Sequence, residues 1–268
     1  RLKYALLALG CGAPERAGLD NGAGWFLTKA VADKGFGARH EVEYCLAVAE
    51  ALGARTSDRS LALPVATADE LWAAQVQREV APQPAGPLVV LHPGTGRYAV
   101  ARRWPAERFA AVGDALAERW GAQPVLVGGH DEVALAEQVA SLSRKPPVLL
   151  AGRTTLRQLA ALLGRAAVFI GNDSGVMHVA TAAGTPVVAI FGPSNHRAWG
   201  PYTGATDAVH PRATVVRVDL PCSPCLYPGR HHGNRRGCPS MDCLRLVTPE
   251  DVVAAVERLL AGQGLLSR

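Results

Sequence analysis

The chain has 268 residues, of which 49% are apolar and 19% are charged, and its formal net charge is +5. These proportions are ordinary for a soluble globular protein, and no apolar run is long enough to predict a membrane-spanning helix. The basic residues are scattered apart from a short group near Arg230 to Arg236, so the charge alone does not indicate nucleic acid. The chain opens with Arg1 in an apolar stretch, and we expect it to be part of a longer protein.

Residues 1–57 predict the end of one domain. Leu2 to Leu9 predicts a helix, Arg16 to Leu19 a short strand, and Trp25 to Val31 is an apolar stretch. His40 to Leu52 predicts a second helix because its apolar residues recur at helical spacing. One face of this helix carries Val42, Cys45, Leu46, Ala49 and Leu52.

Residues 58–86 predict a linker zone. The segment mixes Pro, Ala and polar residues around a short predicted helix at Asp69 to Val80. Prolines and scattered polar residues interrupt regular structure, so we expect a connection between two domains here.

Residues 87–268 predict a complete α/β domain, because short apolar strands alternate with helices. Such alternation favours a parallel sheet covered on both faces, with ligands bound at the carboxyl ends of the strands. The predicted strands are Leu88–Leu91, Pro124–Val127, Val148–Leu150, Val168–Ile170, Pro186–Ile190 and Val215–Val218. The predicted helices are Pro105–Trp120, Glu132–Leu142, Leu156–Leu163, Val176–Ala183 and Thr248–Leu260.

A glycine-containing loop follows the first of these strands and reads HPGTGR, with two arginines shortly after it. Gly94 and Gly96 allow a close approach of the backbone to a ligand, Thr95 adds a hydroxyl, and Arg102 adds positive charge. A diphosphate suits this combination. An ordinary glycine-rich turn is the alternative.

A second candidate loop reads GNDSGVMHVA and leads directly into a predicted helix. The N-terminus of that helix offers N–H groups and partial positive charge to a phosphate, and either Asp173 or Ser174 can cap it. Gly175 leaves room in the first turn, and His178 lies one turn further on. The alternative is that His178 is a packed core histidine and that Asp173 only caps the helix.

Two further loops follow predicted strands. Glu132, in the loop GGHDE, is a candidate for holding ribose hydroxyls, and an acidic helix cap is the alternative. The loop from Phe191 to Asn195, followed by Trp199 to Tyr202, is a candidate lid or wall against a nucleotide base.

The strings HPGTG, RRWPAERFAAV, GNDSGVMHVATAAGTPVVAIFGPSN and WGPY resemble glycosyltransferase family 9, the lipopolysaccharide heptosyltransferases. The resemblance runs from Arg1 to about Gly262. It implies a GT-B fold of two Rossmann-like domains, with residues 1–57 the end of the acceptor-binding domain and residues 87–268 the donor domain. It also implies an enzyme that transfers heptose from ADP-heptose to the lipopolysaccharide inner core with inversion at the anomeric carbon.

The resemblance further implies which residues bind the donor. These are Gly94, Thr95, Gly96, Arg102, Glu132, Asp173, Ser174, Gly175 and His178. Arg102 stands where the family often has a lysine that meets the diphosphate. The family's catalytic base is an Asp early in its N-terminal domain, which this chain does not contain, so no catalytic residue is assigned and the chain alone is expected to be inactive.

The partners implied by the resemblance are the nucleotide-sugar donor and a lipid A–core acceptor, without nucleic acid, cofactor or metal. A cytoplasmic location follows from the same family, and its lipid-linked acceptor suggests peripheral contact with the inner membrane. A nucleotide-sugar-binding protein without turnover and a GT-B transferase for another nucleotide sugar are the alternatives.

Six cysteines remain to be placed. Cys11 and Cys45 stand alone and are expected to be buried free thiols. The other four follow the pattern C-x2-C-x12-C-x4-C, with His231 and His232 between them, which is compatible with structural zinc. Reduced or disulfide-linked cysteines are the alternative, and a zinc-stabilised nucleic-acid module is less consistent with the rest of the chain. These four are Cys222, Cys225, Cys238 and Cys243.

Overall fold

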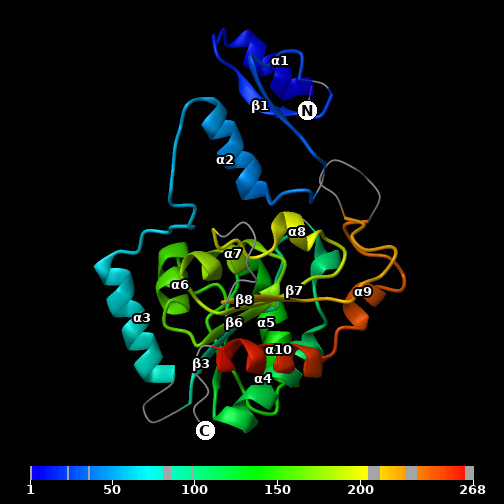
Figure 1. The fold of residues 1–268 in the computed structure, drawn as a ribbon. Coiled ribbons are helices and arrows are strands. Elements are labelled where there is room, and N and C mark those ends of the chain that lie inside the picture. The colour runs from blue at the N-terminus through cyan, green and yellow to red at the C-terminus, as the bar shows by residue number, and fades with distance from the viewer. Residues whose placement is uncertain are drawn as a thin grey trace. The chain divides into compact units, whose positions relative to one another are not determined.

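The computed structural model describes residues 2–22, 24–35, 37–80, 86–97, 99–204, 212–226 and 234–262. The chain divides into two compact units, one made of residues 1–59 with 196–199 and the other of residues 60–195 with 200–268. Figure 1 labels most of the helices and strands named below.

The smaller unit holds helices α1 (Leu2–Gly10) and α2 (Glu41–Ala51) and a parallel pair of strands, β1 (Ala17–Asp20) and β2 (Lys29–Ala32). Helix α2 packs against both strands. The short helix α8 (His196–Trp199) is grouped with this unit. The predicted helices and the first predicted strand are therefore confirmed here.

The expected burial of this unit's cysteines is wrong. Cys11 lies in the turn after α1 and Cys45 lies on α2, and both are exposed. The buried side chain of α2 is Tyr44, whose hydroxyl donates to Gly35 O (3.2 Å) and accepts from Lys34 N (3.1 Å). Helix α2 is thus oriented by Tyr44, and Cys45, one residue further round the helix, points away from the strands.

The larger unit is built on one sheet in the order β5-β4-β3-β6-β7-β8, and all five pairings between neighbouring strands are parallel, as predicted for this sheet. This is the order of a classical dinucleotide-binding domain, in which the direction of winding reverses between β3 and β6. The strands are β3 (Leu88–His92), β4 (Gln123–Leu126), β5 (Val148–Leu149), β6 (Val168–Asn172), β7 (Val187–Ile190) and β8 (Ala213–Val216). All six predicted strands are confirmed within a few residues.

Helices cover both faces of this sheet. Helices α4, α5 and α10 pack together on one side, and α3, α6 and α7 pack together on the other. Their bounds are α3 (Thr67–Val80), α4 (Ala106–Trp120), α5 (Val133–Leu142), α6 (Leu156–Leu163), α7 (Gly175–Ala182) and α10 (Pro249–Ala261). Short helices η1 (Val100–Arg102), η2 (His130–Glu132) and α9 (Asp242–Arg245), none of which the sequence pattern predicts, complete the unit.

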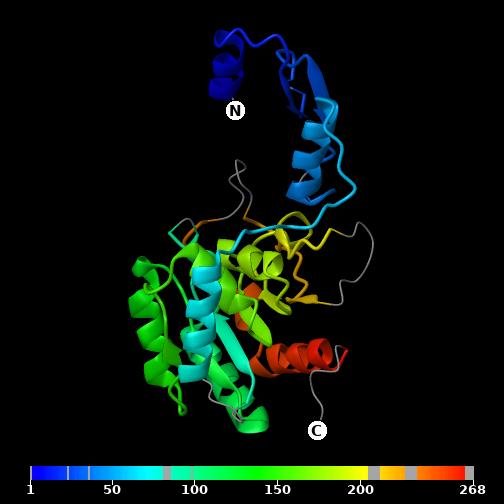
Figure 2. The ribbon, with the colours of Figure 1, turned by 90° about the vertical axis from the view of Figure 1, so that its left-hand side faces the viewer.

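The segment 58–86, predicted as a linker zone, belongs to the larger unit from Ser60 onward. Helix α3 lies beside α6 in both ribbon views (Figures 1 and 2) and buries Ala73 and Val76. A helix with a buried apolar stripe is held by its packing, so this part of the segment adds a covering helix to the sheet.

Local sequence explains where the main helices begin and end. Thr248 caps α10 by accepting from Asp251 N (3.2 Å), and Asp251 in turn accepts from Thr248 N (2.9 Å). Helix α4 ends at Gly121, whose left-handed φ of 63° favours glycine.

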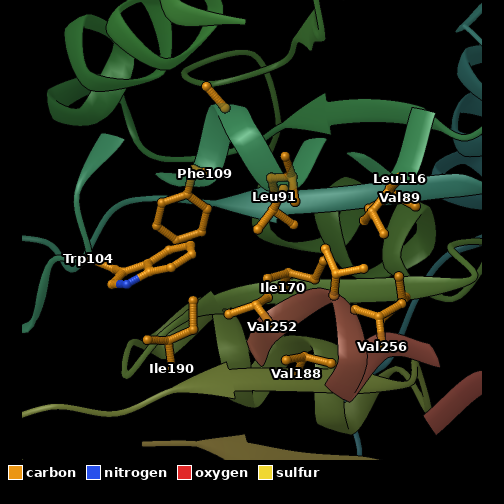
Figure 3. Close-up of a cluster of buried hydrophobic side chains, with 14 of the residues drawn as sticks. Val89, Leu91, Trp104, Phe109, Leu116, Ile170, Val188, Ile190, Val252 and Val256 are labelled. Carbon is orange, nitrogen blue, oxygen red and sulfur yellow. The ribbon is translucent and has the colours of Figure 1, made fainter. Parts of the chain in front are cut away.

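The main core lies between the sheet and the face formed by α4 and α10. Trp104 and Phe109 meet edge to face with ring centroids 5.2 Å apart, beside Ile190, Val252 and Leu91 (Figure 3). Close packing of this kind fixes the strand ends, and thereby the loops that follow them.

Candidate donor-binding site

The candidate site lies at the carboxyl ends of β3 and β6, where the winding of the sheet reverses. The loop after β3 (residues 92–97) and the loop from β6 into α7 (residues 172–175) meet at this point because β3 and β6 are paired along their length. Open parallel sheets bind their ligands in the crevice at such a reversal.

Glu132 ties two of the loops together. Its Oε1 accepts from Gly96 N (2.8 Å), and its Oε2 accepts from Gly129 N (3.1 Å) and lies 3.0 Å from His92 Nε2. Burial raises the pKa of Glu132, but the hydrogen bond and charge of His92 and the two N–H groups outweigh it, and the net pKa falls to about 2. Glu132 is therefore a buried, ionised carboxylate at neutral pH.

The chemical surroundings of Glu132 differ from those expected of a ribose contact. Both of its oxygens bond within the protein, and only 7% of its side chain is exposed. Its bond to Gly129 N also agrees with the alternative of an acidic helix cap. A direct role in ribose binding remains a prediction, whereas the role of Glu132 in ordering the loops follows from these contacts.

His92 links Glu132 to the loop after β6. The sequence pattern does not single out His92, although His92 stands between a buried strand and the glycine loop. Its ring is buried, with Nδ1 3.1 Å from Ser174 Oγ, and it stacks on Phe169 at 6.5 Å between ring centroids. A buried polar ring with both nitrogens engaged fixes the relative position of β3 and the start of α7.

The glycine loop is shaped by protein contacts. A Cβ on Gly94 would come within 2.0 Å of Glu132 Oε1, and Gly96 has a left-handed φ of 64°. The carboxylate of Glu132 therefore leaves no room for a side chain at position 94, and the approach of Gly94 to a ligand stays a prediction. The hydroxyl of Thr95 donates to Ala99 O (3.2 Å) and accepts from Arg103 Nε (3.3 Å).

Positive charge and a helix N-terminus meet beside this loop. Arg102 Nη1 forms an ion pair with Asp173 Oδ2 at 3.2 Å, and Arg102 Nη2 donates to Thr95 O (3.4 Å). Ser174 is the N-cap residue of α7, yet its side chain makes no capping bond. Gly175 is exposed, and a Cβ there would meet nothing within 4 Å, so space is open before the first turn. His178 is half-buried one turn further on.

Asn172 and Trp104 connect the end of β6 to the loop after β3 by buried hydrogen bonds. Asn172 is fully buried, its Oδ1 accepts from Trp104 N (3.0 Å), and its Nδ2 donates to Pro93 O (2.8 Å). Neither residue was predicted as functional. The signal in the sequence is an amide at the end of an otherwise apolar strand, which needs buried partners.

The loop after β7 differs from the expected lid. Phe191 is fully buried and Tyr202 is only 5% exposed, so neither aromatic ring is presented as a lid. Trp199 belongs to α8, which is grouped with the other unit. The loop 191–195 instead supports the cysteine segment, since Cys225 N donates to Pro193 O (2.8 Å).

The four clustered cysteines are free thiols that influence one another. Burial, together with the charges of the other three thiols, raises the pKa of Cys243 to about 11. The N–H of Met241 bonds to Cys238 Sγ (3.4 Å) and lowers the pKa of Cys238. Across the residues with described positions, no three His, Cys, Asp or Glu side chains gather in a way that could hold a metal ion. His231 and His232 lie outside that part of the chain, and zinc remains a prediction.

Comparison with known proteins identifies related sequences. The sequence model described as glycosyltransferase family 9 (heptosyltransferase) matches residues 1–234. Lipopolysaccharide heptosyltransferase 3 of Escherichia coli K12 is 33% identical over 225 residues, which are 82% of this chain and 60% of that protein. Lipopolysaccharide heptosyltransferase 2 of Salmonella typhimurium is 31% identical over 67% of this chain and 48% of its own length. The chain thus spans about half to three-fifths of these curated relatives.

Solved structures share the fold. A family 9 glycosyltransferase from Veillonella parvula is 28% identical with a TM-score of 0.75, over 97% of this chain and 71% of that one. The E. coli ADP-heptose lipopolysaccharide heptosyltransferase II is 23% identical with a TM-score of 0.69, over 98% of this chain and 75% of that one. The predicted fold, α/β of GT-B type, is confirmed by this likeness.

Proposed function

Since the chain belongs to glycosyltransferase family 9, we propose that it acts in an inverting transfer of heptose from ADP-heptose to the lipopolysaccharide inner core. The names of its relatives support the reaction, and the larger unit supports the part played by this chain. That part is donor binding at the carboxyl ends of β3 and β6. The observation that carries the proposal is the uncapped N-terminus of α7 beside Arg102.

The donor's diphosphate would be seated at the start of α7. The backbone N–H groups of a helix's first turn bind phosphate oxygens when no side chain caps them, and the space before Gly175 is open. Arg102 adds a guanidinium group, and its side chain is only 17% exposed. The ion pair with Asp173 holds this guanidinium in place. His178 and Thr95 complete the proposed surroundings of the donor.

These groups suit the departure of a diphosphate. In an inverting transfer the acceptor hydroxyl oxygen attacks the anomeric carbon from the face opposite the diphosphate. The bond from that carbon to the phosphate oxygen breaks, and ADP leaves with the electron pair. Negative charge therefore grows on the diphosphate, and prearranged N–H groups and Arg102 stabilise it.

The proton of the acceptor hydroxyl needs a base elsewhere. The two buried carboxylates of the candidate site are already engaged, since Glu132 accepts three hydrogen bonds and Asp173 is paired with Arg102. A low pKa makes Glu132 a weak base. We assign both residues to the donor site and no base to the described residues.

The acceptor is proposed to be lipid A–core, reached at the cytoplasmic face of the inner membrane. In the described part of the chain, no helix is long and apolar enough to cross a membrane. Contact with the membrane would in this proposal occur through the lipid-linked acceptor.

Incubation with ADP-heptose and a heptose-deficient lipid A–core acceptor tests the proposal. Release of ADP together with a mass gain of one heptose on the acceptor supports transfer. Binding of ADP-heptose without product supports the alternative of a nucleotide-sugar-binding protein. Equal use of a UDP-sugar would contradict the proposed donor.

A further inference from the structure

Helix α7 begins with an N-cap serine whose side chain does not cap the helix. Ser174 has an extended backbone (φ −154°, ψ 166°) and occupies the N-cap position, where a serine side chain ordinarily accepts a bond from the helix's first turn. Its side chain makes no such bond. The hydroxyl instead lies 3.1 Å from His92 Nδ1.

His92 is itself held from the other side. Its Nε2 lies 3.0 Å from Glu132 Oε2, and the ring is 1% exposed. Glu132 is ionised, so it can only accept, and Nε2 must carry the proton that it donates. The other nitrogen, Nδ1, lies within hydrogen-bond distance of the Ser174 hydroxyl, which donates to Nδ1 in the neutral ring and accepts from it in the protonated ring. The carboxylate thus orients the ring of His92 so that Nδ1 holds the Ser174 hydroxyl.

We propose that His92 is a positioning residue that holds the Ser174 hydroxyl away from the N-terminus of α7 and so keeps the first-turn N–H groups available to a diphosphate. The inference rests on the proposed donor site and adds to it the mechanism that keeps it open. Glu132 acts through His92, and its second oxygen orders Gly96 in the facing loop. The buried hydrogen bonds that run from Ser174 through His92 and Glu132 to Gly96 therefore order both the start of α7 and the facing loop.

Without its contact to His92, the Ser174 hydroxyl would compete with the diphosphate for the first N–H groups of α7. The Ser174 side chain would need only to rotate to accept from the N–H of Val176 or Met177, the usual partners of an N-cap. The ligand would then have to displace that bond. Capping free energies correspond to a weakening of diphosphate binding by about five- to tenfold.

Two substitutions of His92 separate its two contacts. In His92→Gln the amide group reaches the position of Nε2 and can still meet Glu132, but nothing remains at Nδ1 to hold Ser174. In His92→Asn the amide group lies near the position of Nδ1 and can still hold Ser174. We expect His92→Gln to bind ADP about five- to tenfold more weakly than the unchanged chain, and His92→Asn to lose clearly less.

The double variant His92→Gln/Ser174→Ala provides the decisive comparison. Removing the hydroxyl removes the competing cap, so the double variant should bind ADP more tightly than His92→Gln alone. A purely structural role of His92 predicts no such recovery. Adenosine, which lacks phosphates, should bind all of these variants alike, and His130→Gln, an exposed histidine near Glu132, serves as the control.

The experiment is a calorimetric titration of each folded variant with ADP and with adenosine, after circular dichroism and thermal unfolding have confirmed the fold. If the unchanged chain does not bind ADP, the proposed donor site fails. If it binds ADP but His92→Gln binds equally well, or the double variant shows no recovery, the role of His92 is refuted. Should His92→Gln not fold, Glu132→Gln takes its place, and an unaltered affinity for ADP would refute the inference.

Discussion

Two regions of the larger unit stabilise the same strand ends by different means. Between the sheet and helices α4 and α10, apolar side chains such as Phe109 and Val252 are completely buried. At the carboxyl ends of β3 and β6, buried polar groups are joined instead by hydrogen bonds, through His92, Glu132 and Asn172. The first region gains stability from area removed from water, and the second from pairing groups that would be costly if left unpaired.

This contrast shows that the loops of a binding site need directional contacts as well as apolar packing. Apolar packing is non-directional and tolerates exchange of similar side chains, whereas a hydrogen-bonded network fixes angles as well as positions. The network therefore lies where loops must be held in one conformation. Substitutions in the core should lower stability alone, and substitutions in the network should affect both stability and ligand affinity.

Trp104→Ala is expected to have the largest effect, because it empties part of the core. The ring is 1% exposed, packs on Phe109, and donates to Val247 O (3.1 Å). The free energy of unfolding should fall by about 4 kcal/mol in denaturant titration. Trp25→Ala, at a side chain that is 73% exposed, is the control and should change it little. Equal effects of the two would contradict the assigned core.

Glu132→Gln should lower the free energy of unfolding by about 3 kcal/mol at pH 7, because it removes the ionised partner of His92. The folded-state pKa of about 2 lies below the ordinary 4.5. The carboxylate's contribution is therefore present above pH 4.5 and is lost as the pH falls toward 2. The difference between variant and unchanged chain should shrink over this window, as measured by unfolding at several pH values.

A control for this prediction lies next to Glu132. Asp131 pairs with Arg97, whose side chain is 88% exposed, and an exposed pair contributes little. Asp131→Asn should hence leave the stability and its pH dependence almost unchanged. A difference between Glu132→Gln and the unchanged chain that grows on acidification would have the wrong sign.

Asn172→Ala should cost about 2 kcal/mol, because it leaves Trp104 N and Pro93 O without their buried partners. Thermal unfolding measures the loss, with Asn234→Ala at an exposed asparagine as the control. The same substitution should also weaken ADP binding, because Pro93 belongs to the loop after β3. Loss of stability with unchanged ADP affinity would show that the two loops keep their arrangement without this residue.

Arg102→Ala should weaken ADP binding about tenfold, or about 1.4 kcal/mol, and should also lower stability, because it leaves the buried carboxylate of Asp173 without its ion-pair partner. Its guanidinium is the positive group beside the proposed diphosphate seat. Arg97→Ala is the matched control, an exposed arginine at the end of the neighbouring loop. Similar affinities of the two variants for ADP would indicate that charge in general, and not Arg102, attracts the nucleotide.

The sequence predicts the elements of the larger unit well, because its apolar strands and amphipathic helices carry their periodicity locally. It wrongly predicts a buried Cys45, which is exposed, and an aromatic lid at Phe191, which is buried, since burial depends on which side of an element meets its neighbours. It also does not show that a side chain at position 94 would meet a carboxylate, because that carboxylate comes from Glu132, distant in sequence. The sequence does not indicate a role for His92, because its partners Glu132 and Ser174 are 40 and 82 residues away.

The central claim is that the carboxyl edge between β3 and β6 binds the ADP part of a nucleotide-sugar donor. Calorimetric titration of the chain with ADP and with UDP, alongside Asp173→Ala, tests it most directly. The account predicts that ADP binds in preference to UDP and that Asp173→Ala weakens it, because Arg102 loses the partner that orients it. Equal binding of both nucleotides, or binding of ADP that Asp173→Ala leaves unchanged, would contradict it.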